Sequence, residues 1–296
     1  MRHPLPHRMA RLLVAALLLV AGAGAALADP PPAGQGDAQY SERMAEEHQH
    51  DTAAASPAAA AAPAMDVVHA SVVYATVDGK EVTGYLARPA KAAAGTPGVI
   101  VIQEWWGLND NIRSMADQIA GEGYVALAVD LYGGKVATTP EEARGLMEAA
   151  MGQTAALADN LRQAYQYLEK QGARRIGSIG WCFGGGWSLQ TALLLPGELD
   201  AAVIYYGRVV TERDELAKLT TPILGHFGSE DKGIPVEGVE TFKKLLAELG
   251  KEAEIHIHQG ADHGFANPSG TRYNAEAAEK AWARTRTFLA EHLQQD

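Results

Sequence analysis

The chain has 296 residues, of which 47% are hydrophobic and 21% are charged, and this composition suits one globular domain with additional segments. Its formal net charge of −11 argues against nucleic acid and anionic membranes as partners, because both carry negative charge themselves. The single cysteine, Cys182, excludes an intramolecular disulfide framework.

The first 28 residues are typical of an export signal. Arg2, Arg8 and Arg11 precede an apolar run over residues 12–26, which is too short and too rich in glycine and alanine to span a bilayer well. Small residues then form a cleavage site directly before Asp29. We therefore expect a signal peptide over residues 1–28, a periplasmic or secreted protein, and no stable membrane anchor after cleavage.

Residues 29–66 have low complexity and are rich in alanine and proline, with a polar cluster over residues 41–51. Such a segment buries too little apolar surface to order itself, so the sequence predicts a disordered linker. Glu47, His48, His50 and Asp51 could bind a divalent metal ion. A solvated tail is the favoured interpretation, because no regular spacing fixes a ligand geometry, and no metal is expected.

Residues 67–296 form the predicted folded domain. Two strand-like runs flank Asp78-Gly79, which is a strong β-hairpin signal. Continuous apolar runs then alternate with helix-like segments. The predicted strands cover residues 72–77, 82–87, 98–102, 124–131, 175–179, 201–206, 222–228 and 254–258, and the predicted helices cover 112–121, 140–151, 156–170, 185–195, 212–219, 236–249 and 275–293. This order predicts an α/β fold with an N-terminal hairpin and a mostly parallel central sheet covered by helices on both faces.

A glycine-rich turn joins the strand at 175–179 to the helix that follows it. The sequence Gly180-Trp181-Cys182-Phe183-Gly184 has the pattern of a nucleophile elbow, with cysteine where serine usually stands. The glycines allow strand and helix to pass closely, and the helix N-terminus favours a thiolate. The alternative is a small apolar residue that packs at a strand–helix junction.

Two further reactive side chains follow strands later in the chain. Asp231 follows the strand at 222–228, and His263 follows the strand at 254–258. The order nucleophile, acid, histidine is that of α/β-hydrolase triads, whose sites form at the C-terminal ends of the strands. Glu230 and Asp262 are weaker candidates for the acid.

This order predicts that Cys182 attacks a carbonyl, that His263 transfers protons, and that Asp231 orients the imidazole. The oxyanion that develops on the substrate needs hydrogen-bond donors. We expect them to be the backbone N–H groups of Phe183, at the helix start, and Trp105, in the loop after the strand at 98–102.

Four segments together resemble the dienelactone hydrolase family. They are Gln103-Glu104-Trp105-Trp106-Gly107-Leu108-Asn109, the glycine-rich turn at Cys182, Ser229-Glu230-Asp231 and Asp262-His263-Gly264-Phe265. The resemblance covers residues 72–293 and implies an α/β-hydrolase fold. It also implies that small esters or lactones are cleaved through a thioester acyl-enzyme, without a cofactor.

The resemblance gives Glu104 a role that its position alone does not. By itself, Glu104 has the character of a charged strand-end residue that bonds nearby backbone. In the family, the matching glutamate pairs with the resting cysteine and takes its proton when substrate displaces it.

The chain departs from the family at two arginines that hold the substrate carboxylate. Their places are taken by Gly133-Gly134-Lys135 and by Asn267. A lysine does not reproduce a bidentate arginine, and Arg208 or Lys135 could compensate only in part. We therefore expect a neutral or weakly anionic ester or lactone as substrate, rather than a dienelactone.

Two other functions are compatible with the sequence: a non-catalytic binding protein on a hydrolase fold, and a thiol redox sensor that uses Cys182 with an external thiol. The run Gly184-Gly185-Gly186 lacks the lysine of a phosphate-binding loop, so no nucleotide is expected. The sequence carries no signal for an oligomeric state. Most aromatic residues near the motifs are expected in the core, with one or two lining a pocket: Trp105, Trp106, Tyr132 and Trp187.

Overall fold

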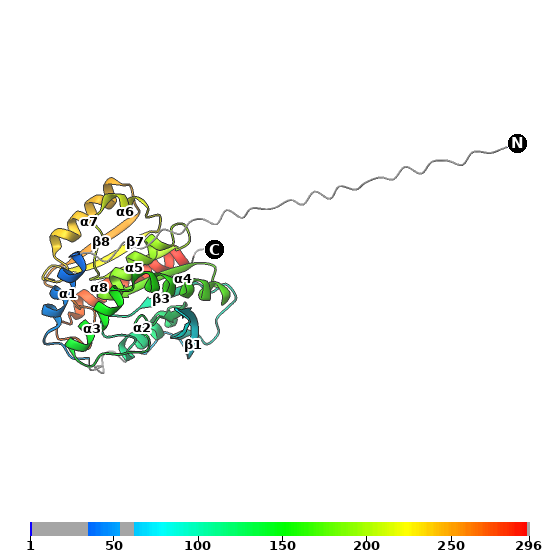
Figure 1. Ribbon diagram of the computed structural model, residues 1–296, viewed down its shortest axis with the longest axis horizontal. Helices are drawn as coiled ribbons and strands as arrows, with labels where there is room; N and C mark the ends of the chain where they lie inside the picture. The colour runs from blue at the N-terminus through cyan, green and yellow to red at the C-terminus, as the bar shows by residue number, and fades with distance from the viewer. Residues whose placement is uncertain (2–34, 54–61, 295–296) are drawn as a thin grey trace.

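The computed structural model describes Met1, residues 35–53 and residues 62–294 (Figure 1). The expected export signal and its cleavage site after Ala28 lie outside the described residues, apart from Met1. In the described part of the chain, no helix is both long enough and apolar enough to cross a bilayer.

Within the described residues, one eight-stranded sheet forms the centre of the domain, in the order β1-β2-β4-β3-β5-β6-β7-β8. The strands are β1 (Val67–Val77), β2 (Lys80–Pro89), β3 (Gly98–Ile102), β4 (Val125–Ala128), β5 (Ile176–Trp181), β6 (Ala201–Tyr205), β7 (Ile223–Gly228) and β8 (Ala253–His258). Strands β3 to β8 pair in parallel, whereas β2 is antiparallel to both β1 and β4. The predicted mostly parallel sheet is therefore confirmed.

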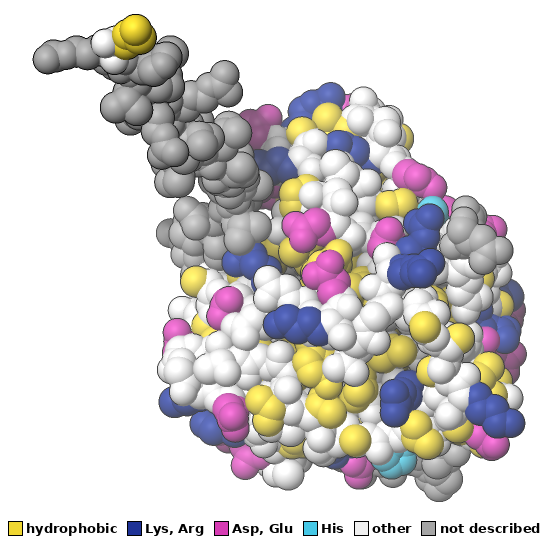
Figure 2. Space-filling model, turned by 90° about the vertical axis from the view of Figure 1, so that its right-hand side faces the viewer, with side chains coloured by type: hydrophobic (Ala, Val, Ile, Leu, Met, Phe, Trp, Pro, Cys, Tyr) yellow, Lys and Arg dark blue, Asp and Glu magenta, His cyan; other side chains and the backbone are white. Residues whose placement is uncertain are grey.

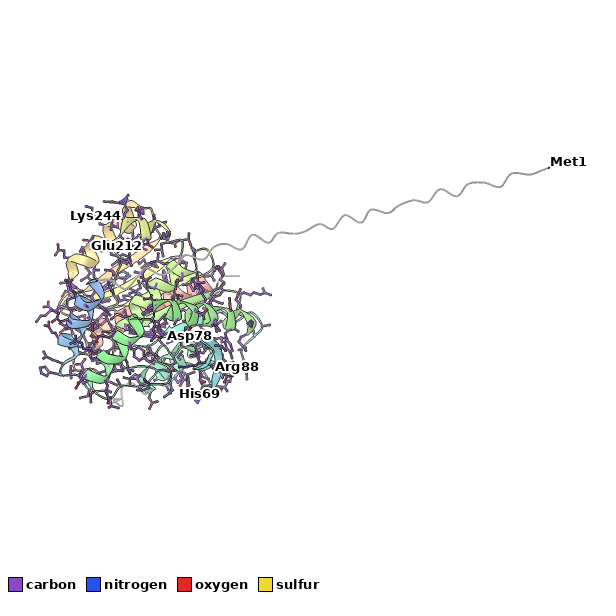
Figure 3. All side chains as sticks on the ribbon, in the orientation of Figure 1. Met1, His69, Asp78, Arg88, Glu212 and Lys244 are labelled. Carbon is purple, nitrogen blue, oxygen red and sulfur yellow. The ribbon has the colours of Figure 1, made fainter. Side chains whose placement is uncertain are left out.

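The predicted hairpin is the β1–β2 pair. Asp78 and Gly79 at its tip have φ angles of 49° and 74°, the left-handed geometry of a tight hairpin turn. Figure 3 labels Asp78 on the side of the domain away from Glu212 and Lys244.

Helices cover both faces of the sheet, as the alternation of elements predicts. They are α2 (Asp110–Gly121), α3 (Pro140–Met151), α4 (Thr154–Lys170), α5 (Phe183–Leu194), α6 (Arg213–Ala217), α7 (Val236–Glu248) and α8 (Ala275–Leu293). The Ser178 hydroxyl of β5 lies 2.8 Å from the Ser188 hydroxyl of α5. The neighbouring Gly177 points to the other face, where it meets Leu293 of α8. Strand β5 therefore lies in the middle layer, between α5 and α8.

Charged side chains are distributed over the surface. On the face drawn in Figure 2, acidic and basic groups alternate with small apolar areas, and neither sign covers the whole face. The chain's net negative charge is thus not gathered into one patch on this side of the molecule.

Helix α1 (Gln35–His48) is the main departure from the sequence prediction. Tyr40, Met44 and His48 lie at four-residue intervals on one side of this helix, and all three are buried. Ser41 is buried as well and donates a 2.6 Å hydrogen bond to Glu148 of α3, next to which α1 lies in Figure 1. The expectation of disorder over residues 29–66 is therefore wrong for this helix. Its few large side chains share one face, and this is sufficient for docking against the domain.

Candidate active site

The turn between β5 and α5 holds Cys182 in a strained conformation. Its φ and ψ angles are 54° and −118°, and a non-glycine residue with positive φ costs about 1–3 kcal/mol. A Cβ atom on Gly180 would collide with the carbonyl of Gly184, and one on Gly185 would lie 2.6 Å from the carbonyl oxygen of Tyr205. The two glycines allow strand and helix to meet tightly enough to present the sulfur at the start of α5. The predicted elbow geometry is thus present at Cys182.

The loops after β7 and β8 bring Asp231 and His263 together. His263 Nδ1 lies 2.8 Å from Asp231 Oδ2, and neither side chain is exposed to solvent. The other carboxylate oxygen accepts a 2.8 Å hydrogen bond from the Ile234 N–H, which fixes the carboxylate plane. His263 Nε2 has no hydrogen-bond partner among the described residues, and it lies within 4.8 Å of Cys182 Sγ.

The charges of these groups determine where the protons are. Burial lowers the pKa of His263, but the Asp231 carboxylate and the Cys182 thiolate outweigh it and raise this pKa well above its ordinary value. Burial raises the pKa of the Cys182 thiol, but His263 and His48 together lower it to about 6. The two shifts together favour a thiolate beside an imidazolium.

Glu104 lies in the loop after β3 and faces two polar partners. Tyr206 donates a 3.4 Å hydrogen bond to Oε1, and Asn267 donates a 2.7 Å hydrogen bond to Oε2. Burial and the neighbouring thiolate raise the pKa of Glu104 to about 7. Within the described residues, Glu104 forms no hydrogen bond to Cys182, so the pairing that the resemblance implies is not seen in this state.

The two expected oxyanion donors come from the elbow and from the loop after β3. The N–H of Phe183 is the first of α5, where backbone donors have no partner within the helix. Trp105 follows β3 by three residues, and its side chain is fully buried.

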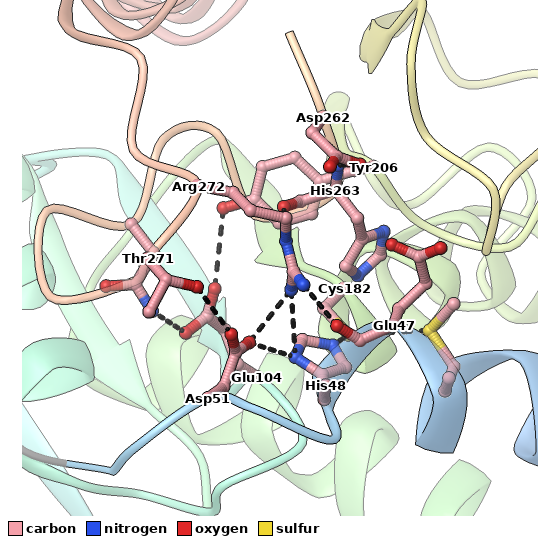
Figure 4. A network of polar contacts seen from close by, with 12 residues as sticks. Glu47, His48, Asp51, Glu104, Cys182, Tyr206, Asp262, His263, Thr271 and Arg272 are labelled. Atoms are coloured by element: carbon pink, nitrogen blue, oxygen red, sulfur yellow. Dashed lines mark hydrogen bonds and ion pairs between the residues drawn. The ribbon is translucent and has the colours of Figure 1, made fainter.

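The structure adds a second histidine to the site (Figure 4). His48, the last residue of α1, places its Nε2 3.6 Å from Cys182 Sγ, and its Nδ1 lies 2.6 Å from Asp51 Oδ2. Arg272 and Thr271 in turn each donate a 2.8 Å hydrogen bond to the Asp51 carboxylate. His48 and Asp51 enter the sequence interpretation only as metal candidates in a solvated tail, and Arg272 does not enter it at all. The one sequence signal for this docking is the four-residue spacing that ends at His48.

Three side chains at this point could hold a soft divalent metal ion. The ligand atoms of His48, Cys182 and His263 lie within 4.8 Å of one another, and each imidazole has a carboxylate behind its other nitrogen. Zinc sites use imidazole nitrogen and thiolate sulfur as ligands, and a carboxylate often accepts a hydrogen bond from the other nitrogen of each imidazole. Of the other metal candidates in the tail, His50 is exposed and Glu47 is not part of this group.

A cavity of about 700 Å³ opens beside the elbow. Its lining includes Phe183 and Trp187 of α5 and Tyr40 and Arg43 of α1, together with Arg208. The Arg208 guanidinium lies 5.4 Å from the centre of the Tyr40 ring. Trp187 is thus the aromatic residue of the predicted set that lines this cavity, whereas Trp105, Trp106 and Tyr132 are buried in the core.

Known proteins resemble this chain in sequence and in fold. Residues 82–293 match the model of the dienelactone hydrolase family. A protein of Saccharolobus solfataricus named "Putative carboxymethylenebutenolidase" is 34% identical over 249 residues, which cover 72% of this chain and 95% of that protein. Protein usf of Aquifex pyrophilus is 31% identical and covers 73% of this chain and 96% of its own length.

A solved structure named m3DLH superposes with a TM-score of 0.70 at 27% identity, covering 77% of this chain and 99% of the other. The chain therefore belongs to the dienelactone hydrolase family and is a carboxylic ester or lactone hydrolase.

Proposed function

We propose that this protein is an exported hydrolase of small esters or lactones that works through Cys182, His263 and Asp231. One observation carries the proposal. The buried 2.8 Å contact between Asp231 and His263 leaves the other imidazole nitrogen unpartnered, facing a sulfur on a strained elbow. This is the order of contacts that nucleophilic acyl transfer requires.

The reaction follows from this order. The Cys182 thiolate attacks the carbonyl carbon, a C–S bond forms, and the carbonyl electrons move to oxygen. The N–H groups of Trp105 and Phe183 stabilise that oxyanion, and loss of one such donor costs about 3 kcal/mol. When the intermediate collapses, the C–O bond breaks and His263 Nε2–H protonates the leaving oxygen. Water then attacks the thioester with His263 as the base, which releases the acid and restores the thiolate.

Glu104 modulates the thiol in this proposal. With a pKa of about 7, the carboxyl group of Glu104 changes from its neutral to its charged form near neutral pH. A charged carboxylate beside the sulfur disfavours the thiolate, whereas a neutral carboxyl group does not.

The substrate is a neutral or weakly anionic ester or lactone. Asn267 stands where the family carries an arginine, and its amide is already bonded to Glu104. An amide carries no charge with which to hold a substrate carboxylate. The apolar walls of the cavity, Phe183 and Trp187, fit a small uncharged acyl or alcohol group.

Export rests on the leader-like sequence over residues 1–28. N-terminal sequencing of protein secreted by its host should give a chain that begins at Asp29. A mature chain that begins at Met1 would contradict export.

The function is tested with a panel of p-nitrophenyl esters and simple lactones. Cys182→Ala should abolish turnover and labelling by iodoacetamide, and Cys182→Ser should keep at most slight activity. Mass spectrometry of the quenched enzyme should show an acyl group on Cys182. An unchanged kcat/KM for Cys182→Ala would overturn the proposal.

A further inference from the structure

His48 lies on a segment outside the family match, which begins at residue 82. Nevertheless its ring is in the middle of the site. It stacks on Trp105 with ring centres 4.1 Å apart, and it meets the His263 ring edge-on at 5.1 Å. Its Nε2 is 3.6 Å from Cys182 Sγ, and only 5% of the residue is exposed.

A network of buried contacts fixes this histidine. Arg272 donates to the Asp51 carboxylate at 2.8 Å and to the backbone carbonyl of His263 at 2.8 Å. The same guanidinium also donates to the backbone carbonyl of Glu47. One arginine thus ties the segment that carries His48 to the loop that carries His263, as Figure 4 shows.

The hydrogen bonds of His48 determine what its Nε2 can do. Nδ1 has two close neighbours, the Asp51 carboxylate at 2.6 Å and the Arg272 guanidinium at 3.3 Å. The carboxylate contact is much the shorter, so it places the proton on Nδ1. Nε2 then either accepts the thiol proton or, as part of an imidazolium, donates to the thiolate. In the transfer, the S–H bond breaks, the proton bonds to an imidazole nitrogen, and the electron pair stays on sulfur.

We propose that His48 is a second histidine of the catalytic site, whose buried Nε2 contacts the sulfur of Cys182 directly, so that residues 35–53 are part of the enzyme's active site. The sulfur then lies between two imidazoles, each supported by an aspartate. The inference rests on the nucleophilic role proposed for Cys182.

Other titratable groups face the sulfur as well. Burial raises the pKa values of Tyr40, Tyr132 and Tyr206 well above their ordinary range, so these three stay neutral. Burial also raises the pKa of Glu47, which lies at the edge of the site. Glu104 is the charged group that opposes the thiolate. His48 and His263 are therefore the two that favour it.

The alternative is that His48 only shields the Cys182 sulfur from solvent, and this alternative predicts a different result. Met44 Sδ lies 4.0 Å from Cys182 Sγ, so Met44 and His48 both shield the sulfur, but only His48 can carry a proton. Met44→Ala is therefore a matched control. It uncovers the sulfur from the same helix without changing any charge.

The experiment measures the rate of iodoacetamide alkylation against pH without substrate, in the intact chain. A chelator is present, so that no metal ion on the three ligand atoms blocks the thiol. In His48→Gln, the midpoint of the profile should rise by about one to three pH units, because the imidazole that contacts the sulfur is lost. Alkylation at pH 6 should then fall by about tenfold or more, whereas the midpoint should not rise in Met44→Ala, which only lessens the burial of the sulfur.

Equal midpoints in wild type and His48→Gln would overturn the inference, as would equal shifts in His48→Gln and Met44→Ala. If His48→Gln folds poorly, Asp51→Asn provides a second test, because it weakens the support of the same imidazole and should raise the midpoint in the same direction. The proposed hydrolase function fails separately, when Cys182→Ala retains turnover.

Discussion

Asn267 donates a 2.7 Å hydrogen bond to Glu104, across 163 positions of the chain. The amide therefore stabilises the charged form of a carboxyl group that burial would otherwise keep protonated. This contact connects a position at which the chain departs from its family to the residue that we propose to modulate the thiol.

Removal of this contact should change the pH dependence of the reaction. In Asn267→Ala, the carboxylate of Glu104 loses a donor, so its pKa should rise above about 7. We expect the limb of the kcat/KM pH profile that reports the titration of Glu104 to move to higher pH. Ser269→Ala is the control, because the hydroxyl that it removes donates to Asn111, whereas the bond from the Ser269 N–H to Asn267 is kept. Identical pH profiles in wild type and Asn267→Ala would exclude a role for this hydrogen bond.

Glu104→Gln should affect the free enzyme only where the carboxyl group is charged. Below about pH 6 the wild-type carboxyl group is mostly protonated, so both proteins should alkylate at the same rate. Above about pH 7 the wild-type carboxylate opposes the thiolate, and Glu104→Gln should react faster with iodoacetamide and with peroxide. Coincident alkylation profiles over the whole range would make Glu104 a structural residue only.

Cys182, His263 and Asp231 should behave as one unit in kinetics. His263→Ala added to Cys182→Ala should cost little beyond Cys182→Ala alone, because residues of such a unit are strongly non-additive. Asp231→Asn should lower kcat/KM. Glu230→Gln should be nearly silent, because the Glu230 side chain is exposed and, among the described residues, accepts a hydrogen bond only from the Ser229 hydroxyl. Additive losses, or a silent Asp231→Asn, would show that the assignment is wrong.

The positions of Cys182, Asp231 and His263 in the fold were predictable because each depends on a local pattern. Glycines on both sides of Cys182 mark the turn, and Asp231 and His263 each follow a buried run that reads as a parallel strand. The docking of α1 was not predictable in this way. Its segment is polar on average, and its partners, such as Glu148 and Arg272, are more than a hundred positions away. The composition of such a segment predicts a disordered tail, because the surface of the domain on which it docks forms only when the domain folds.

Truncation should show that α1 is part of the domain. A chain that begins at Met65 loses the buried side chains of Tyr40, Met44 and His48. Burial of one large apolar side chain stabilises a protein by about 1.5–3 kcal/mol, so the free energy of unfolding should decrease. Its Tm and its kcat/KM should both be lower than those of a chain that begins at Gln35, which should match the full chain. Equal Tm values for the Met65 and Gln35 chains would show that α1 contributes nothing to the fold.

Docking of α1 should weaken in acid. Burial raises the pKa of Asp51, but the hydrogen bond and charge of His48, together with Arg272, lower it from 3.8 to about 2. Because the docked state binds the proton less tightly, its stabilisation of about 2 kcal/mol is complete above about pH 4 and is lost as the pH falls through 2. Tryptophan fluorescence should report this, since His48 stacks on Trp105. Asp51→Asn should show no such transition.

The contacts of Asp51 with Thr271 and Arg272 span 220 and 221 positions of the chain. The segment that carries His48 precedes the central sheet in the chain, but these binding partners lie in the loop after β8. A folding intermediate in which this loop is not yet docked therefore cannot contain the complete pair of imidazoles around the sulfur. We expect full reactivity of the Cys182 thiol only after the loop that carries Thr271 and Arg272 has docked. The rate at which alkylation of Cys182 develops during refolding can therefore measure the final step of folding.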